Sequence, residues 1–241
     1  GAQVTLLDKQ PAPGGSSILS GGAMAFAGTD EQRAAGVEDS DDRLYDDLRK
    51  VGGMVNDKAL LRTYVDRQLD TYRWLKARGV QFESVQLGGG QSVPRSNRTR
   101  PPQVIGALAS HATGTGRVEL LTGTAARRLV MHEGRVAGLL ARTGTTETSI
   151  AARRGVVLTA GGFSRSEEML KQFAPAQARA KRVGGPGNTG DGLRMAWQLG
   201  AGLRDMGYIK GTFGNHPDAG PEQHTAIDRK STRLNSSHGY I

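Results

Sequence analysis

The sequence predicts an α/β fold of the nucleotide-binding, Rossmann-like type, with a parallel sheet and an antiparallel β-meander inserted into it. Two apolar runs, Val4–Leu7 and residues 155–160, have the length of buried parallel strands, and a glycine-rich stretch is associated with each. Short apolar segments between residues 117 and 153, separated by turn residues, predict the meander. In open α/β sheets, ligands bind where parallel strands end, so the glycine-rich stretches are the candidate ligand sites.

The first glycine-rich stretch, residues 8–22, begins with an acid and contains two glycine pairs. A carboxylate at the end of a strand can accept hydrogen bonds from two adjacent ribose hydroxyls. Glycine lets the backbone approach a diphosphate closely, and its N–H groups point at the anion. A mobile surface loop is the alternative interpretation. We favour a nucleotide site, whose candidate residues are Asp8, Gly14, Gly15, Ser16, Ser17, Gly21 and Gly22.

Two helices are expected next, at about 42–51 and from Asn56-Asp57 to Arg78, with glycines after both ends. The apolar stripe of the second helix should pack into the core rather than against a cofactor. That stripe consists of Leu60, Leu61, Tyr64, Val65, Leu69, Tyr72 and Leu75.

Three arginines gather in the loop 94–102, at Arg95, Arg98 and Arg100. Two interpretations stay open for this loop. It either contacts a phosphate or an anionic substrate, or it is a solvated basic loop. A helix should follow at about 103–112, and its His111 has no acid partner nearby in the sequence, so we expect a structural or surface histidine.

The region 117–153 predicts a strand at Val118–Leu121 and then the meander, in strands 125–131, 135–142 and 146–151. His132 lies in the first turn and should be exposed. The second apolar run, ending at Gly161-Gly162, should be a buried parallel strand, and Ser164 is the expected cap of the helix 167–173.

Composition excludes several classes of function. The chain has no cysteine, which rules out disulfides, thiolate metal ligands and cysteine catalysis, and we assign no metal site. The formal net charge is +9, but the arginines are scattered, aromatic residues make up only 5% and no nucleic-acid motif is present. We therefore expect no nucleic-acid partner. No apolar run approaches membrane-spanning length, so we expect no transmembrane segment.

Three motifs together resemble the flavoproteins of the fumarate reductase and succinate dehydrogenase type, a group that includes 3-ketosteroid dehydrogenases. The motifs are Asp8-Lys9 with the two glycine pairs, residues 157–163, and residues 188–192, in the order and spacing of that family. The resemblance covers about residues 1–210 and implies FAD as the cofactor. It places Asp8 at the ribose and the loop 14–22 at the diphosphate and the edge of the flavin, and it makes Lys9 a further cofactor contact.

The resemblance also implies roles for later segments. Residues 23–29 would run beside the flavin ring, unless they are plain core packing. The backbone near Ala126 would receive the adenine. The remaining cofactor contacts would come from Thr159, Ala160, Gly161 and Asp191, and Asp191 is also a candidate helix cap.

The implied reaction is hydride transfer between the flavin and a C–C or C=C bond next to a carboxylate or carbonyl. The substrate would be a small carboxylate, ketone or steroid, and the electron donor or acceptor is not assigned. Fumarate reductases carry a His-Pro substrate contact after a strand near residue 208. Here the ungapped equivalent is Thr212, and His216-Pro217 comes four residues later. We take Thr212 and His216 as candidate substrate contacts, assign no catalytic residue, and keep a 3-ketosteroid dehydrogenase-like flavoenzyme as the alternative.

We expect three segments along the chain. Residues 1–207 form an FAD-binding domain that lacks its first βα unit, since the family places a strand and a G-x-G-x-x-G turn before Gly1. Residues 208–227 begin a substrate-capping domain. Residues 228–241 match the translation of a common sequencing adapter. The missing start leaves the compartment open, with the cytoplasm favoured. We expect the chain to purify colourless or with less than one FAD per chain, and an inert fragment that binds no cofactor is a further alternative.

Overall fold

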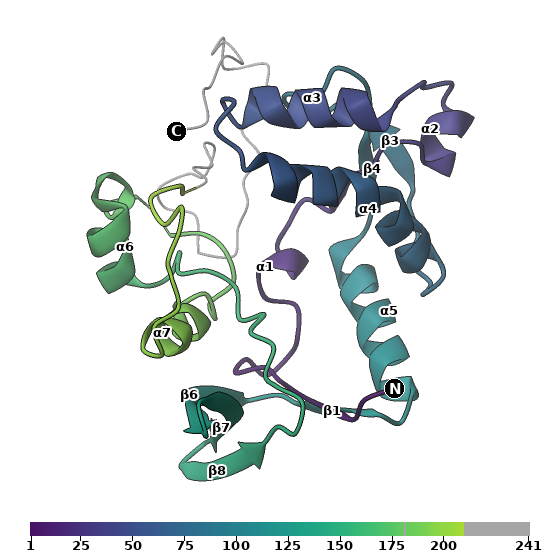
Figure 1. Ribbon diagram of the computed structural model, residues 1–241. Coiled ribbons are helices and arrows are strands. Elements are labelled where there is room, and N and C mark those ends of the chain that lie inside the picture. The colour runs from purple at the N-terminus through teal and green to yellow at the C-terminus, as the bar shows by residue number, and fades with distance from the viewer. Residues whose placement is uncertain (181, 210–241) are drawn as a thin grey trace. The chain divides into compact units, whose positions relative to one another are not determined.

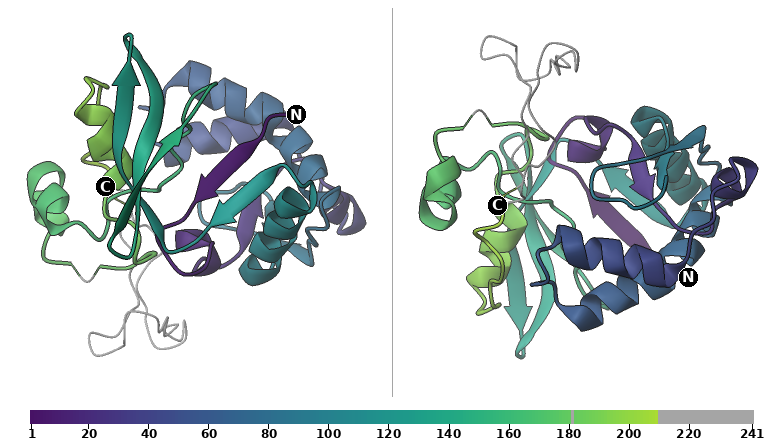
Figure 2. Two further views of the ribbon diagram at one scale, coloured as in Figure 1. Left: turned by 90° about the horizontal axis from the view of Figure 1, so that it is seen from below. Right: turned by 90° about the horizontal axis from the view of Figure 1, so that it is seen from above.

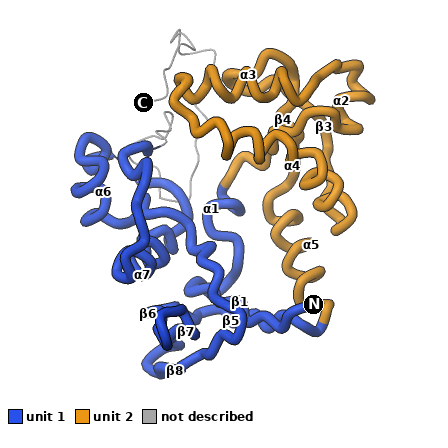
Figure 3. The backbone as a smooth tube through the Cα atoms, viewed as in Figure 1, with its two compact units in different colours: residues 1–19, 116–241 blue, residues 20–115 orange. Residues whose placement is uncertain are grey.

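The computed structural model describes residues 1–180 and 182–209 and divides the chain into two compact units (Figure 3). Unit 1 contains residues 1–19 and the chain from residue 116 onward, and unit 2 contains residues 20–115. The expected boundaries at 207, 227 and 228 remain predictions, because residues 210–241 lie outside the described part of the chain.

Unit 1 contains a parallel pair of strands from distant parts of the sequence. Strand β1 (Val4–Leu7) pairs with β5 (Val118–Leu121), with Val4 opposite Val118 and Leu7 opposite Leu121. The two strands lie side by side in Figure 2. The prediction of a buried strand is wrong for β1, since Val4 and Leu6 are 46% and 42% exposed. Among the described residues this sheet has only two strands, and only Leu7 of β1 packs against a core cluster.

The antiparallel meander is confirmed. It consists of β6 (Thr124–His132), β7 (Arg135–Thr143) and β8 (Thr146–Ala151), paired in that order (Figure 1). Glu133 and Gly134 connect β6 to β7 with φ angles of 49° and 75°, as a tight hairpin turn requires. The register shifts between Ala126 and Arg128, so Arg127 forms a β-bulge. The inner face of the meander packs Leu129, Leu139 and Ala141 against Met195.

Residues 155–160 do not form the expected strand. They carry no strand pairing in the described part of the chain, and Val157 and Leu158 are 85% and 38% exposed. An apolar run becomes a strand only where a neighbouring strand satisfies its N–H and C=O groups. The pattern of residue types reveals the apolar run but not a partner strand.

Two short helices follow in unit 1, α6 (Glu167–Phe173) and α7 (Asp191–Trp197), with a 3₁₀ turn at Pro175–Gln177 after α6. The cap of α6 is Ser166, whose hydroxyl accepts a hydrogen bond from the Met169 N–H, and not Ser164 as the sequence suggested. The buried face of α6 packs into a cluster of Phe163, Met169, Leu170 and Ala174.

Unit 2 is built from helices around a small antiparallel sheet with strand order β2-β4-β3. The prediction of two long helices followed by a third is confirmed. The elements are β2 (Ala23–Ala25), α2 (Asp30–Ala34), α3 (Asp41–Val51), α4 (Lys58–Lys76), β3 (Ser84–Gln86), β4 (Ser96–Arg98) and α5 (Pro101–Gly114).

Helix α4 is the central packing element of unit 2. Its Tyr72 stacks with Phe26 and Phe82 at ring-centroid distances of 5.8 and 5.0 Å, so the core interpretation of the aromatic stripe is confirmed for Tyr72. It is wrong for Leu60 and Tyr64, which are 71% and 45% exposed. His111 on α5 and His132 are both exposed, as expected.

Candidate cofactor site

Three glycine-rich segments that are far apart in the sequence converge within unit 1. They are the loop before α1 (Gly15–Ile18), the turn at Gly161-Gly162, and the loop 184–191. A Cβ atom added to Gly185 would lie 2.7 Å from the carbonyl carbon of Gly15, so the two backbones are in direct contact. The N–H of Gly190 donates to the carbonyl of Gly162 at 3.0 Å. The predicted cofactor motifs therefore form one cluster rather than three separate loops.

Lys9 and Asp191 hold one side of this cluster. The Lys9 Nζ donates to Asp191 Oδ2 at 2.6 Å and to the Thr189 hydroxyl, and Thr189 Oγ1 donates to Asp191 Oδ1 at 2.8 Å. Burial raises the pKa of Asp191, but the hydrogen bonds from Lys9 and Thr189 and the Lys9 charge outweigh it, and the pKa lies below its usual value. Asp191 is not the helix cap, since Gly190 with φ of 79° occupies that position.

Asp8 lies at the end of β1, where its backbone is fixed between two strands. Its N–H donates to Leu121 of β5, and its C=O accepts from Thr124 of β6, both at 3.0 Å. One carboxylate oxygen accepts from the Gln10 N–H at 2.9 Å. The other oxygen has no hydrogen-bond donor among the described residues. A positioned carboxylate with one open oxygen suits a hydroxyl of a ribose.

The loop Gly14-Gly15-Ser16-Ser17 has a backbone that other residues adopt rarely, since φ is 135° at Gly14 and 49° at Gly15. The Ser16 hydroxyl accepts hydrogen bonds from the Gly185 N–H at 2.9 Å and from Asn188 Nδ2 at 2.6 Å. Ser17 is exposed, and its side chain has no hydrogen-bond partner among the described residues.

The remaining unit 1 candidates lie on exposed or edge positions. Thr159 and Ala160 are exposed in the extended segment, and Ala160 lies against the first turn of α7, 3.1 Å from where a Cβ at Gly192 would be. A Cβ at Gly161 would lie 2.5 Å from Asn188 Oδ1. Ala126 is on β6 immediately before the bulge at Arg127, where the ladder is interrupted.

Gly21 and Gly22 belong to unit 2, and the contacts within this unit explain why position 22 is a glycine. Its carbonyl accepts from the N–H and the hydroxyl of Thr99 at 2.8 and 2.7 Å. A Cβ there would lie 2.2 Å from the Thr99 carbonyl oxygen, and φ is 73°. Glycine at position 22 is thus required by the fold of unit 2, whatever else it contacts.

The segment 23–29 forms β2 and then enters the core, with Phe26 and Ala27 only 5% and 2% exposed. The core-packing interpretation is therefore confirmed for these two side chains. Gln68, which the sequence analysis did not select, binds both the N–H and the C=O of Ala27, at 2.9 and 3.0 Å.

Arg95 was expected either to contact a phosphate or anionic substrate or to lie in a solvated loop, and both expectations are wrong. Its side chain is 1% exposed and forms a two-pronged contact with Asp39, at 2.9 Å from Nε and 2.7 Å from Nη2. Its Nη1 also pairs with Asp47. Arg100 pairs with Glu83 at the surface. Arg98 on β4 has no side-chain hydrogen-bond partner among the described residues and keeps both open interpretations.

The carboxylates around Arg95 are held ionised. Burial raises the pKa of Asp39, but hydrogen bonds from Arg95 and Gln32 lower it further than burial raises it. Burial likewise raises the pKa of Asp47, and hydrogen bonds from Ser92 and Arg95 again bring it below its usual value. This network is a structural feature of unit 2 and not a ligand site.

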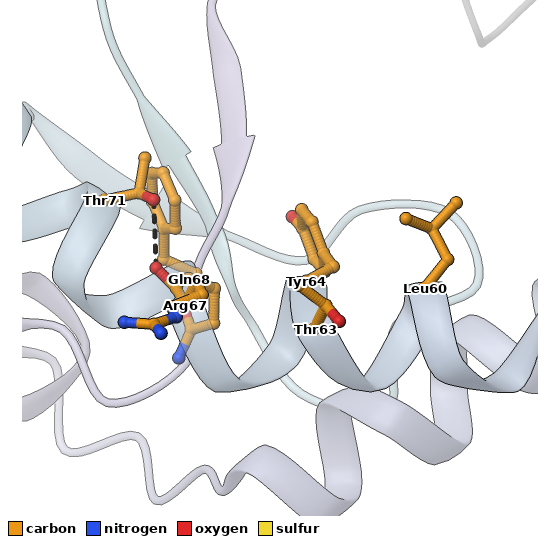
Figure 4. Close-up of a pocket in the computed structure, with 7 residues that line it drawn as sticks. Leu60, Thr63, Tyr64, Arg67, Gln68 and Thr71 are labelled. Atoms are coloured by element: carbon orange, nitrogen blue, oxygen red, sulfur yellow. Dashed lines mark hydrogen bonds between the residues drawn. The ribbon is translucent and has the colours of Figure 1, made fainter.

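Unit 2 also carries a pocket of about 390 Å³ along α4, lined by Phe26, Leu60, Thr63, Tyr64, Arg67, Gln68 and Thr71 (Figure 4). Its hydroxyls are already bonded to the backbone, as Thr63 donates to Ala59, Thr71 to Arg67 and Tyr64 to Ala25. With these groups engaged, the pocket offers a ligand mainly apolar contact, and we place the cofactor site in unit 1.

The candidate substrate residues Thr212 and His216 lie outside the described residues. Among residues 1–180 and 182–209, no cluster of three or more histidines and acids is arranged to hold a metal ion. Within the same part of the chain, none of the helices combines the length and hydrophobicity needed to cross a bilayer.

The structure adds two residues that sequence reasoning missed, Asn188 and Thr189. Both stand inside a motif that the sequence analysis quoted, and a polar residue between glycines was the available signal. Their partners, Ser16 and Lys9, lie more than 170 residues earlier in the chain, so no local pattern could pair them.

Comparison with known proteins defines the class. The FAD binding domain family matches residues 1–217, and the chain belongs to this family, whose cofactor is FAD. A fumarate reductase (cytochrome) of Shewanella frigidimarina is 31% identical over 216 residues, which is 87% of this chain and 38% of that protein. A urocanate reductase of Eggerthella lenta is 34% identical over 218 residues, 87% of this chain and 36% of that protein.

Solved structures agree on the fold. The open conformation of a flavocytochrome c3 fumarate reductase matches with a TM-score of 0.84 and 28% identity, covering 94% of this chain and 40% of that one. A 3-ketosteroid-delta4-(5alpha)-dehydrogenase from Rhodococcus jostii matches with a TM-score of 0.78 and 24% identity, covering 84% and 50%, which shows the fold alone. This chain spans 39%, 23% and 38% of the lengths of three curated relatives.

The donor set of unit 1 fits FAD. An open carboxylate oxygen on Asp8 matches a ribose, and the Gly14–Ser17 loop supplies backbone and hydroxyl donors for a diphosphate. The close contact between Gly185 and the Gly15 backbone leaves no room for a side chain at position 185, whereas Gly15 is favoured by its φ of 49°.

Proposed function

We propose that this chain binds FAD through the cluster of loops in unit 1 and supplies the flavin-binding part of an oxidoreductase. The observation that carries the proposal is the convergence of Gly14–Ser16, Gly161-Gly162 and the loop 184–191. Hydrogen bonds across about 170 residues of sequence join these loops into one structured cluster, which supports a shared role in binding.

Each candidate has a defined part in this proposal. The open oxygen of Asp8 accepts from the ribose, and the Gly14–Ser17 loop donates to the diphosphate. The interrupted ladder at Ala126 leaves backbone groups for the adenine. Gly21 and Gly22 would contribute to the diphosphate and the edge of the flavin, as the resemblance implies.

Lys9 has two tasks. An ammonium has three N–H donors, and Thr189 and Asp191 accept two of them. The third is left for an oxygen of the cofactor. Asp191 holds Lys9 and Thr189 in place. Thr159, Ala160 and Gly161 would contact the cofactor beside them, as the resemblance implies.

When bound, FAD would donate or accept a hydride, and the carbon–carbon bond that reacts would lie next to a carboxylate or carbonyl. Curated relatives of this chain are named fumarate, urocanate, vinyl phenol and acrylate reductases. All four named compounds carry a carbon–carbon double bond conjugated to an acid or an aromatic ring. We therefore propose reduction of such a double bond in a small-molecule substrate, with Thr212 and His216 as candidate substrate contacts.

A titration with FAD tests the binding proposal. The flavin fluorescence should change in a saturable way with one FAD per chain, and Asp8→Asn should weaken binding, because the amide offers only one acceptor oxygen and no charge. Asp66→Asn removes an exposed negative charge from α4 in unit 2, and it distinguishes a loss specific to the site from a loss caused by any change in charge. Absence of saturable binding would contradict the proposal and support an inert chain.

A second experiment tests the reaction. Bound flavin is reduced anaerobically with dithionite, and its reoxidation is followed by absorbance. Reoxidation by fumarate or urocanate supports the reductase proposal. Reoxidation by a 1,4-diene-3-ketosteroid alone would favour the steroid dehydrogenase-like alternative, which rests on the Gly187–Gly192 motif.

A further inference from the structure

The Ser16 hydroxyl accepts two hydrogen bonds within the protein but donates none among the described residues. A serine hydroxyl has one hydrogen and two acceptor lone pairs. Both acceptor positions are used within the protein, by the Gly185 N–H at 2.9 Å and by Asn188 Nδ2 at 2.6 Å. No acceptor for the hydroxyl hydrogen is present among the described residues.

This arrangement fixes the direction of the hydroxyl hydrogen. With both lone pairs turned toward Gly185 and Asn188, the O–H bond points away from the loop 184–191. Ser16 is exposed in the first turn after the Gly14-Gly15 pair, so its hydrogen faces the space where an acceptor can approach. The hydroxyl can serve an incoming ligand only as a donor, which suits an oxygen that only accepts, such as a diphosphate oxygen.

Asn188 is itself held firmly. Its N–H donates to the Gly185 carbonyl at 3.0 Å, and its carbonyl accepts from the Arg165 N–H at 2.9 Å. Arg165 also clamps the same loop, donating from Nε and Nη2 to the Gly184 carbonyl at 3.1 and 2.8 Å. On the other side, the Asn188 Oδ1 lies so close to Gly161 that a Cβ there would be 2.5 Å away.

We infer that Asn188 is a positioning residue that orients the Ser16 hydroxyl as an obligatory donor to a diphosphate oxygen of FAD. This inference rests on the proposed function and adds a residue and a mechanism to it. Asn188 links all three glycine-rich segments, through Ser16, Gly161 and its own loop. It acts on the cofactor through Ser16.

A double-mutant cycle measures this coupling. The FAD dissociation constant is determined by fluorescence titration for the unchanged chain, Ser16→Ala, Asn188→Ala, Asn188→Asp and the corresponding double variants. Ser16→Ala should weaken FAD binding about tenfold, as for a lost hydrogen bond to a charged group. Asn188→Ala should weaken it less, because water can replace the amide as donor.

Asn188→Asp is the discriminating variant. A carboxylate is only an acceptor, so the Ser16 hydrogen should turn toward it and be lost to the diphosphate. The added negative charge also weakens binding, but that effect persists in the Ser16→Ala background. The effect of Asn188→Asp should therefore be several-fold larger in the chain that keeps Ser16 than in the Ser16→Ala background. Ser16→Thr keeps the hydroxyl and should retain most of the affinity.

Ser110→Ala, an exposed serine on α5 in unit 2, is the matched control and should bind FAD unchanged. The ³¹P spectrum of bound FAD gives a readout that does not depend on affinity, and a diphosphate resonance should shift in Ser16→Ala and in Asn188→Asp. Additive effects in the cycle, or wild-type affinity in Asn188→Asp, would overturn the inference while the binding proposal stands. No FAD binding by the unchanged chain would overturn both.

Discussion

Arg95 carries a positive charge that water does not reach. Its side chain is 1% exposed, and its partners Asp39 and Asp47 are 0% and 8% exposed. Buried charges are tolerated only when every one of them is paired and hydrogen-bonded. Gln32 and Ser92 complete the network, at 2.9 Å from Asp39 and 2.7 Å from Asp47.

Removing the guanidinium should be severe. Arg95→Met leaves two carboxylates buried without a counter-charge, which costs about 3–5 kcal/mol of unfolding free energy. Urea denaturation followed by circular dichroism measures this loss. Arg100→Met is the matched control, since Arg100 pairs with Glu83 at the surface with a side chain 65% exposed, and its loss should cost less than about 1 kcal/mol. Equal effects of the two changes would contradict a structural role for Arg95.

The same network predicts a pH dependence. The pKa values of Asp39 and Asp47 are lower in the folded chain than their ordinary value of 3.8, so the folded state binds fewer protons than the unfolded state. The stabilisation is fully present above the unfolded pKa and is lost as the pH falls through the folded pKa values. Urea midpoints should therefore fall steeply below about pH 4. In Asp39→Asn this slope should be shallower, and an unchanged slope would contradict the assignment.

Elements with local start and stop signals could be predicted from the sequence, whereas elements that depend on distant partners could not. Helix α4 begins where expected, because Asp57 accepts from the N–H groups of Ala59 and Leu60, both at 3.0 Å. The hairpin at Glu133-Gly134 is likewise local. The run 155–160 failed as a strand because pairing is a tertiary property, and β4 was missed because three polar residues give no strand pattern.

The N-cap of α4 tests whether a local start signal stabilises a helix of this protein. Asp57→Ala should lower the unfolding free energy by about 1 kcal/mol, because two N–H groups of the first turn lose their acceptor. Asp57→Ser should retain most of the stability. Asp66→Ala removes an exposed acid from the interior of the same helix and controls for the change in charge and helix propensity. A loss in Asp66→Ala as large as that in Asp57→Ala would show that capping is not the cause.

At the scale of the whole molecule, the sequence predicted the class of cofactor site but not its internal contacts. Asp8 and the first glycine pair were selected because their types and spacing suit a dinucleotide, and Asp191 was selected because the family resemblance implies it. The pairing of Lys9 with Asp191, and of Ser16 with Asn188, joins segments that no periodicity relates. Gly22 was selected for the ligand, and the structure shows that its close approach to Thr99 already requires glycine.

The proposed FAD site lies at the junction of three loops in unit 1. Hydrogen–deuterium exchange of the chain, with and without saturating FAD, tests that placement most directly. FAD should slow exchange in peptides that cover residues 8–19, 159–163 and 184–191, since these loops would be ordered together by one ligand. Helix α5 (Pro101–Gly114) should exchange at the same rate in both states. Protection confined to other segments, or no protection at saturation, would contradict this placement.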